Sequence, residues 1–179
     1  VLTTTFVLAA SQGHVPWCFP FIDGCAEITD TGIHAPESYV FRFGLMPIAT
    51  LMGLLFYFFR EWIVYRKGAP STKANIAFYL AIAASVSLLL SIAVFPGPNE
   101  TTVRFHAITA VIFFFLMLIS QILYTREDFS VRDDRDHPAI KVRLAVNVLQ
   151  FLLLLIFLVQ LFVFFSTAYI IFEWWLALS

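Results

Sequence analysis

The chain has 179 residues, 60% of them hydrophobic and 13% charged, and its mean hydropathy is +0.86. Soluble domains are nearer ~45–50% apolar and ~25% charged, so this composition excludes a water-soluble globule. The net charge of −1 gives no reason to expect nucleic acid as a partner, and two Cys and four His are too few for a Cys-rich zinc site. We therefore expect membrane lipids as partners, and neither a metal nor a cofactor beyond a bound phospholipid or sterol.

Hydrophobic stretches define the expected membrane spans, because a helix that crosses a bilayer needs about 20 mostly apolar residues. In chain order the spans are 1–11 (partial), 41–64, 74–95, 103–124, 139–165 and 168–179 (partial). Residues 139–179 as one helix would be roughly 60 Å long at ~1.5 Å per residue, so we place a break near Ser166 and Thr167. A cleaved signal peptide is the alternative for the N-terminal stretch. The predicted fold is all-α, a single transmembrane domain (1–179) that forms a polytopic bundle of six spans, the first and last incomplete.

The distribution of basic residues predicts the orientation of the bundle. Nine of the 11 lie around two loops on one side, namely Arg60, Arg66, Lys67, Lys73, Arg126, Arg132, Arg135, Lys141 and Arg143. Only Arg42 and Arg104 lie on the other side, so the positive-inside tendency places the nine in the cytosol. The loop 12–40 then faces the lumen or the exterior. The charged segment 125–138 is expected to be a solvated linker, with a docking site as the alternative.

Two features of the predicted outer loops agree with this orientation. Cys18 and Cys25 are the only cysteines, and an oxidising compartment would allow a disulfide between them, the alternative being two free thiols. Asn99 begins the only Asn-x-Ser/Thr sequence, Asn99-Glu100-Thr101, and is a glycosylation candidate unless it lies too close to the membrane.

Small residues recur at helical spacing in the second and third spans, at Ala49, Gly53, Ala77, Ala81, Ala84 and Ser91. Small residues allow close helix packing in lipid. These faces are either helix contacts within the chain or contacts with another membrane protein.

Ionisable groups at membrane depth are costly and usually functional. The spans and the loop above them bring six such groups to the outer leaflet, namely Asp30, Glu37, Arg42, Arg104, His106 and Glu173. One interpretation is a lipid-headgroup pocket in which the arginines hold phosphate and His106 faces Glu173. The other is an interhelical lock in which Glu173 pairs with His106 or an arginine. Both interpretations stay open at this point.

The segment Ile28–Phe41 reads ITDTGIHAPESYVF and resembles the first outer loop of the DRAM/FRAG/SFK superfamily of six-span proteins, roughly I-S-D-x-G-x-x-P-P-E-x-x-I-F. Thr29 stands for Ser, and Ala35 replaces the first Pro. Three later segments are also similar to this family: His106-Ala107 with Ala110 and Phe113–Phe115, then Val142-Arg143-Leu144, then Phe172-Glu173-Trp174.

The resemblance implies work on membrane lipid in the Golgi, lysosome or plasma membrane, since members regulate autophagy, remodel GPI-anchor lipid or affect phospholipid asymmetry. It supplies no catalytic motif. We therefore expect a non-enzymatic membrane protein that binds, remodels or traffics lipid, or regulates autophagy. One alternative is a lipid-modifying enzyme with His106 as base and Glu173 or Asp30 as its orienter, although the sequence places no nucleophile beside His106. The other is an accessory subunit of a larger membrane complex.

Overall fold

The computed structural model describes residues 1–94, 99–131, 138–160 and 168–179, and within these ranges it contains helices and no strand. The long helices are α3 (Glu37–Lys67), α4 (Thr72–Ala93), α5 (Glu100–Val131) and α6 (Pro138–Val159). The short ones are α1 (Leu2–Ser11), α2 (Pro20–Asp23), the 3-10 turn η1 (Asp30–Gly32) and α7 (Tyr169–Leu178). All four long helices have the length and the apolar composition to cross a membrane. The expected all-α polytopic bundle is confirmed.

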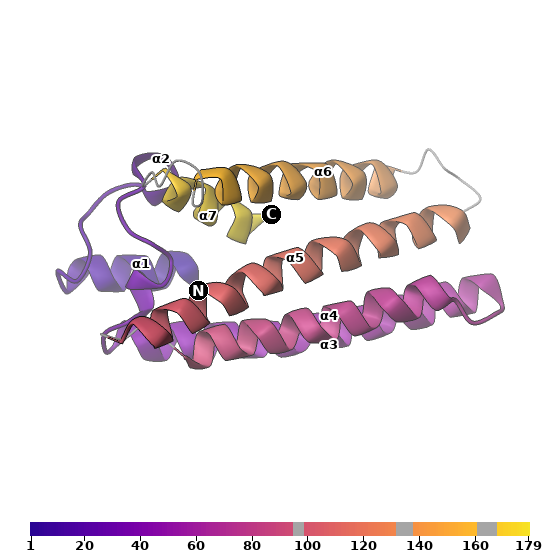
Figure 1. Cartoon of the computed structure of the whole chain (residues 1–179), viewed down its shortest axis with the longest axis horizontal. Coiled ribbons are helices and arrows are strands. Elements are labelled where there is room, and N and C mark those ends of the chain that lie inside the picture. Colours follow the sequence, from indigo (N-terminus) through magenta and orange to yellow (C-terminus); the bar gives the residue numbers. More distant parts are fainter. Residues whose placement is uncertain (95–98, 132–137, 161–167) are drawn as a thin grey trace.

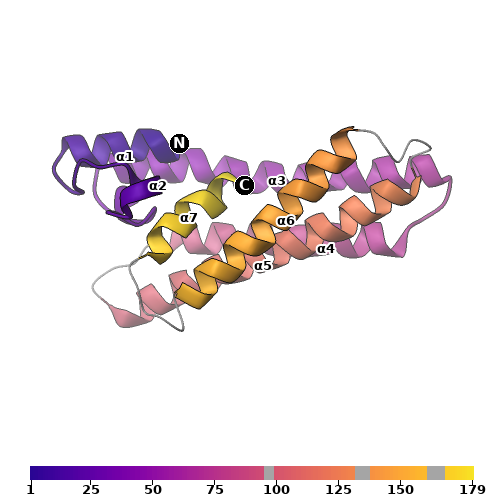
Figure 2. The same ribbon diagram turned by 90° about the horizontal axis from the view of Figure 1, so that it is seen from above.

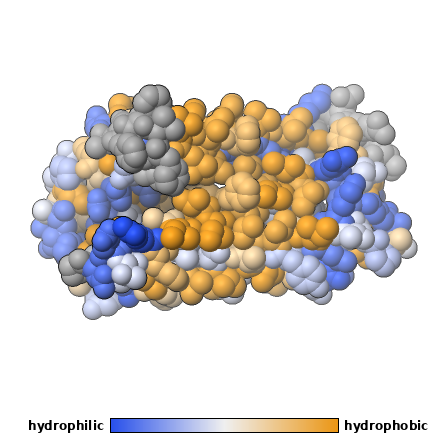
Figure 3. Space-filling model, viewed as in Figure 1, coloured by the Kyte–Doolittle hydropathy of each residue, from blue (hydrophilic) through white to orange (hydrophobic). Residues whose placement is uncertain are grey.

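Helices α3 and α4 run along the long axis of the molecule, and α6 crosses obliquely over α5 (Figures 1 and 2). Helix α4 packs between α3 and α5, and α6 packs against α5 and α7. On the face shown in Figure 3, apolar residues cover the middle and hydrophilic residues gather toward both ends. This pattern suits a hydrocarbon core ~30 Å thick between two aqueous interfaces.

The helices differ from the expected spans mainly in length. Helices α3 and α5 extend past 41–64 and 103–124 at both ends, while α1 and α7 occupy the two partial spans. Helix α4 ends at Ala93 and α6 at Val159, and residues 95 and 161–165 of the expected spans lie outside the described residues. The same holds for the expected break at Ser166 and Thr167 and for Arg132 and Arg135.

The two ends of the bundle have different chemistry. At the loop end, segment 12–36 and helices α1, α2 and α7 gather around the start of α3 (Figure 1). At the basic end, α3 turns into α4, α5 ends and α6 begins, so the described members of the nine basic residues lie there.

At the loop end, one tryptophan organises the core. Trp174 on α7 is 1% exposed, and its indole N–H donates to the Ala26 carbonyl at 2.9 Å. Its ring meets Phe6 of α1 and Phe21 of α2 edge to face, at centroid distances of 6.1 and 5.2 Å. Cys18 and Cys25 form a disulfide, so the first of the two alternatives for these cysteines is confirmed.

In the middle of the bundle, the small residues serve packing within the chain. Ala49, Gly53, Ala77, Ala81, Ala84 and Ser91 are all buried. A Cβ at Gly53 would lie 3.0 Å from Ile82 Cδ1, and Ser120 of α5 donates to the Ala77 carbonyl at 2.6 Å. The buried small residues therefore form helix contacts within the chain. Binding of another membrane protein through these faces stays a prediction.

At the basic end, the expectation of a solvated linker over 125–138 was wrong for residues 125–131. Helix α5 continues to Val131, and Glu127 is only 3% exposed. Its carboxylate accepts from Ser71 at 2.6 Å and from Lys67, and Lys73 lies 3.8 Å away. Asp128, also buried, accepts from Arg143 of α6 at 2.8 Å. These contacts explain why charged residues extend the helix instead of entering water.

Candidate functional site

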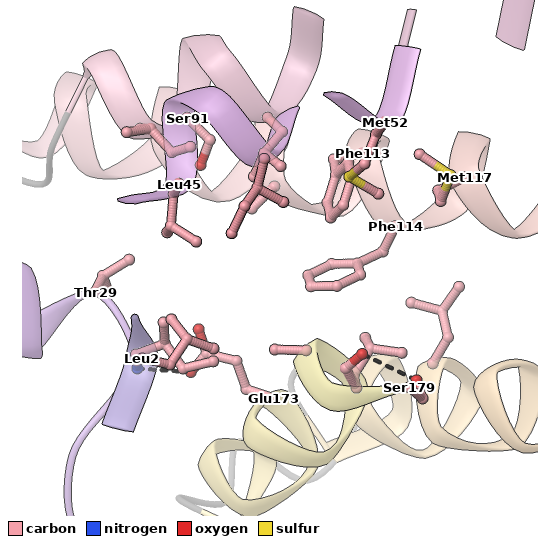
Figure 4. Close-up of a pocket in the computed structure, with 18 of the residues that line it drawn as sticks. Leu2, Thr29, Leu45, Met52, Ser91, Phe113, Phe114, Met117, Glu173 and Ser179 are labelled. Atoms are coloured by element: carbon pink, nitrogen blue, oxygen red, sulfur yellow. Dashed lines mark hydrogen bonds between the residues drawn. The ribbon is translucent and has the colours of Figure 1, made fainter. Parts of the chain in front are cut away.

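A cavity of about 290 Å³ lies between the helices in the half of the bundle nearer the loop end. Its walls are mostly apolar. In Figure 4, Leu45 and Met52 of α3 and Phe113 and Met117 of α5 lie on one side, and Leu2 and α7 lie on the other. Binding cavities for small molecules are typically of this kind, apolar with a few polar groups that fix orientation. The polar groups therefore decide what this cavity can hold.

Glu173 is the acidic group in the cavity wall. Trp174 fixes this part of α7 in the loop-end core, and the Glu173 carboxylate accepts a long hydrogen bond of 3.4 Å from the Ile28 backbone N–H (Figure 4). Within the described part of the chain, no basic side chain forms an ion pair with Glu173. This contact joins α7 to the loop backbone, and among the described residues neither His106 nor an arginine pairs with Glu173.

His106 of α5 lines the same cavity and bonds to α4. Its Nδ1 lies 2.8 Å from the Ser91 carbonyl oxygen. Because a carbonyl oxygen only accepts, Nδ1 must carry the proton and donate it to this bond. The Ser91 hydroxyl lies 3.2 Å from the same nitrogen and 3.4 Å from the His106 carbonyl. Nδ1 is already a donor, so it cannot accept the Ser91 proton.

Gln150 of α6 contributes a further polar group that the sequence reasoning did not include in the site. Its side-chain oxygen is buried and accepts no hydrogen bond from any described residue. An unsatisfied buried acceptor costs about 1–3 kcal/mol. A ligand with a hydroxyl or amide N–H would remove that penalty. The signal in the sequence is a glutamine at mid-span, with Gln121 of α5 also in the cavity wall.

The other four predicted site residues do not line the cavity. Asp30 accepts from the Glu27 backbone N–H at 3.2 Å, and Glu37 pairs with His14. Arg104 is exposed and pairs with Glu100 one helical turn away, at 2.6 Å. Arg42 lies exposed on α3. The structure thus brings His106 and Glu173 to one cavity and leaves the two arginines outside it.

Two of the remaining polar residues have structural roles. Glu37 is fully buried at the start of α3, and its contact with His14 ties that helix to the segment after α1. Asn99 accepts from the Thr101 backbone N–H at 3.0 Å and so caps the start of α5. Its side chain is exposed, and its glycosylation stays a prediction.

The comparison with protein families decides the relationship of the chain. A family model described as the Frag1/DRAM/Sfk1/Cwh43P N-terminal domain matches residues 1–179. The chain belongs to this family. The resemblance inferred from the loop and three later segments is confirmed, and the chain is an integral, multi-pass membrane protein. No curated protein and no solved structure matches the chain.

In this member of the Frag1/DRAM/Sfk1/Cwh43P family, three of the four segments that carry the resemblance surround the cavity. Ile28, Thr29 and Phe41 come from the loop segment, His106 and Phe113 from the second, and Glu173 from the last. The remaining segment, Val142-Arg143-Leu144, lies at the basic end, where Arg143 pairs with Asp128. Segments far apart in the chain thus meet around one space.

Proposed function

We propose that this protein binds a lipid in the loop-end cavity and, without catalysing a reaction, helps to remodel or traffic lipid in the endomembrane system or the plasma membrane. The observation that carries the proposal is the convergence of three family-like segments on one mostly apolar cavity between the helices. A role in regulating autophagy would be a consequence of such lipid handling in a lysosomal membrane.

The cavity chemistry favours a lipid with a hydrogen-bond donor over one recognised through phosphate. Glu173 and Gln150 both present acceptor oxygens, and neither arginine lines the wall. An acceptor-rich wall repels a phosphate group but accepts from a hydroxyl or an amide N–H. A sterol, a diacylglycerol or a ceramide has this combination of one such donor and a large apolar body.

Replacing Ala110 by Phe tests the proposal, because Ala110 lines the cavity and a phenyl ring there would occupy the space that the lipid needs. We expect Ala110→Phe to lower the amount of hydroxyl- or amide-bearing lipid that copurifies with the protein about tenfold, which corresponds to ~1.4 kcal/mol of lost affinity. The measurement is lipid extraction from the full-length protein purified in mild detergent, followed by mass spectrometry.

The matched control is Ala107→Phe, three residues earlier on α5, at an exposed position that does not line the cavity. It adds the same ring to the same helix and should leave the bound lipid unchanged. If both variants retained lipid equally well while remaining folded, the cavity would not be the binding site.

One contact bears on the enzyme alternative, but its geometry argues against His106 as the base. The structure places the Ser91 hydroxyl beside His106, a juxtaposition that the sequence does not reveal. A Ser–His pair needs an imidazole nitrogen that accepts the hydroxyl proton. The nitrogen facing Ser91 is instead a donor to the Ser91 carbonyl. This geometry supports an interhelical tie in preference to an activated nucleophile.

We further propose that the loop end faces the lumen or the exterior and the basic end faces the cytosol. The positive-inside tendency and the Cys18–Cys25 disulfide both support this orientation.

Cysteine labelling tests the orientation, because the chain contains no other cysteine. In sealed organelle vesicles that keep the cytosolic face outward, we expect an impermeant maleimide to react only after permeabilisation and reduction. The Cys18→Ser, Cys25→Ser double variant gives the background. Labelling of sealed vesicles after addition of an impermeant reductant would reverse the proposed orientation.

A further inference from the structure

A second apolar groove lies between α5 and α6 at the basic end, away from the loop end. Its volume is about 480 Å³, and the described residues that line it differ from those that line the loop-end cavity. Ile122 and Phe129 of α5 face Leu144, Val148 and Phe151 of α6 across it, and each of the five is at least 41% exposed. In Figure 2, α6 lies obliquely over α5. A groove with such walls can bind an apolar chain, because binding removes apolar surface from water.

Two of the polar side chains in the groove bond to each other. Asn147 of α6 donates its side-chain amide to the Thr125 hydroxyl of α5 at 2.9 Å, and Asn147 itself is buried. This bond ties the two helices together within the groove. The groove interior therefore offers its occupant apolar contact, and specificity must come from its edge.

Arg126 supplies a charge at that edge. It lines the groove one helical turn, about 6 Å, beyond Ile122 toward the basic end, and its side chain is exposed. It forms no ion pair or hydrogen bond with any described residue. The carboxylates that follow it in sequence bind elsewhere: Glu127 accepts from Lys67 and Ser71, and Asp128 accepts from Arg143. Arg126 is thus a cation at the mouth of an apolar groove with both neighbouring acids bound to other helices.

We infer that this groove binds one acyl chain of an anionic phospholipid from the leaflet at the basic end, with Arg126 on its headgroup phosphate. An arginine at the interface above an apolar groove matches the layout of such a lipid, with its phosphate at the surface and its chain in the hydrocarbon. An apolar helix of a second protein would cover the walls equally well, but it would leave Arg126, which pairs with none of the described residues, without an anion. The inference is independent of the loop-end cavity, which differs in residues, leaflet and ligand chemistry.

The full-length protein reconstituted in phosphatidylcholine vesicles tests the headgroup contact. Electron spin resonance would compare the motionally restricted fractions of spin-labelled phosphatidylserine and phosphatidylcholine. We expect a preference for phosphatidylserine that falls about fivefold in Arg126→Gln, the effect of one interfacial cation. Arg66→Gln removes a cation from α3 at the same end, outside the groove and stacked on Trp62, and should change the preference little.

Two adjacent positions on α6 test the groove itself. Val148 and Leu149 are 51% and 49% exposed, but only Val148 lines the groove. We expect Val148→Trp to remove the restricted phosphatidylserine component and Leu149→Trp to retain it. A preference that survives both Arg126→Gln and Val148→Trp would overturn the inference. So would Val148→Trp dissociating a dimer with no change in lipid restriction, because the groove would then be a protein interface. Ala110→Phe should not affect this measurement, so the groove and the cavity are tested separately.

Discussion

Trp174→Ala is expected to lower the free energy of unfolding by about 3–5 kcal/mol, in the range found for buried aromatic residues replaced by alanine. The indole is enclosed by Phe6 of α1 and Phe21 of α2, and its N–H donates to the Ala26 carbonyl at 2.9 Å. The substitution therefore leaves a large hole and removes the donor to a buried carbonyl. The measurement is denaturant or thermal unfolding of the purified protein in detergent micelles.

The neighbouring tryptophan provides the control. Trp175 is 47% exposed, and its N–H donates to the Phe21 carbonyl at 3.1 Å, so Trp175→Ala should cost about 1 kcal/mol or less. Trp174→Phe keeps an aromatic ring and removes the N–H, and its effect should fall between the two. Equal effects at the two tryptophans would contradict the role given to Trp174 as the centre of the loop-end core.

The loss of Trp174 should also reach the cavity. Glu173 precedes it on α7 and accepts from the Ile28 N–H, so the tryptophan holds the cavity wall in place through one peptide unit. We expect Trp174→Ala to release copurifying lipid even at temperatures where the bundle remains folded. Trp175→Ala should not do so.

Hydropathy predicted the helical bundle because a bilayer imposes its thickness on every span. It did not predict where the helices end, because their ends depend on contacts between distant residues. Helix α5 continues beyond Glu127 because Lys67 and Ser71, near the α3–α4 turn, donate hydrogen bonds to the Glu127 carboxylate. A hydropathy average over residues 125–138 shows only that the segment is polar, and it cannot show which distant residues pair with its charges.

Only part of the candidate site could be predicted, because the rest depends on contacts between residues that are far apart in the chain. His106 and Glu173 stand out because an ionisable group within a span is rare, and both line the cavity. Arg104 was grouped with them by depth alone, yet Glu100 four residues earlier offers a local partner that the spacing already indicates. The cavity volume follows from how Leu45, Phe113 and the other wall residues pack, and no pattern in one sequence specifies a space between side chains.

Ala84→Leu tests whether the small-residue stripe packs the chain's own helices, and it should lower the free energy of unfolding by about 3 kcal/mol. Ala84 is fully buried in the core cluster that α4 shares with α3 and α5. A leucine there must push the helices apart, because small residues allow their close approach, and overpacking typically costs about 1–3 kcal/mol. Unfolding in detergent micelles measures the effect.

Ala83→Leu is the matched control, the same change one residue earlier at an exposed position on α4. A leucine facing lipid disturbs no helix contact, so its effect should stay within about 0.5 kcal/mol. If the stripe were instead an interface for another protein, Ala84→Leu would leave the isolated chain as stable as Ala83→Leu and would disrupt only the complex. A lower stability of Ala84→Leu than of Ala83→Leu would therefore show that the stripe holds the bundle together.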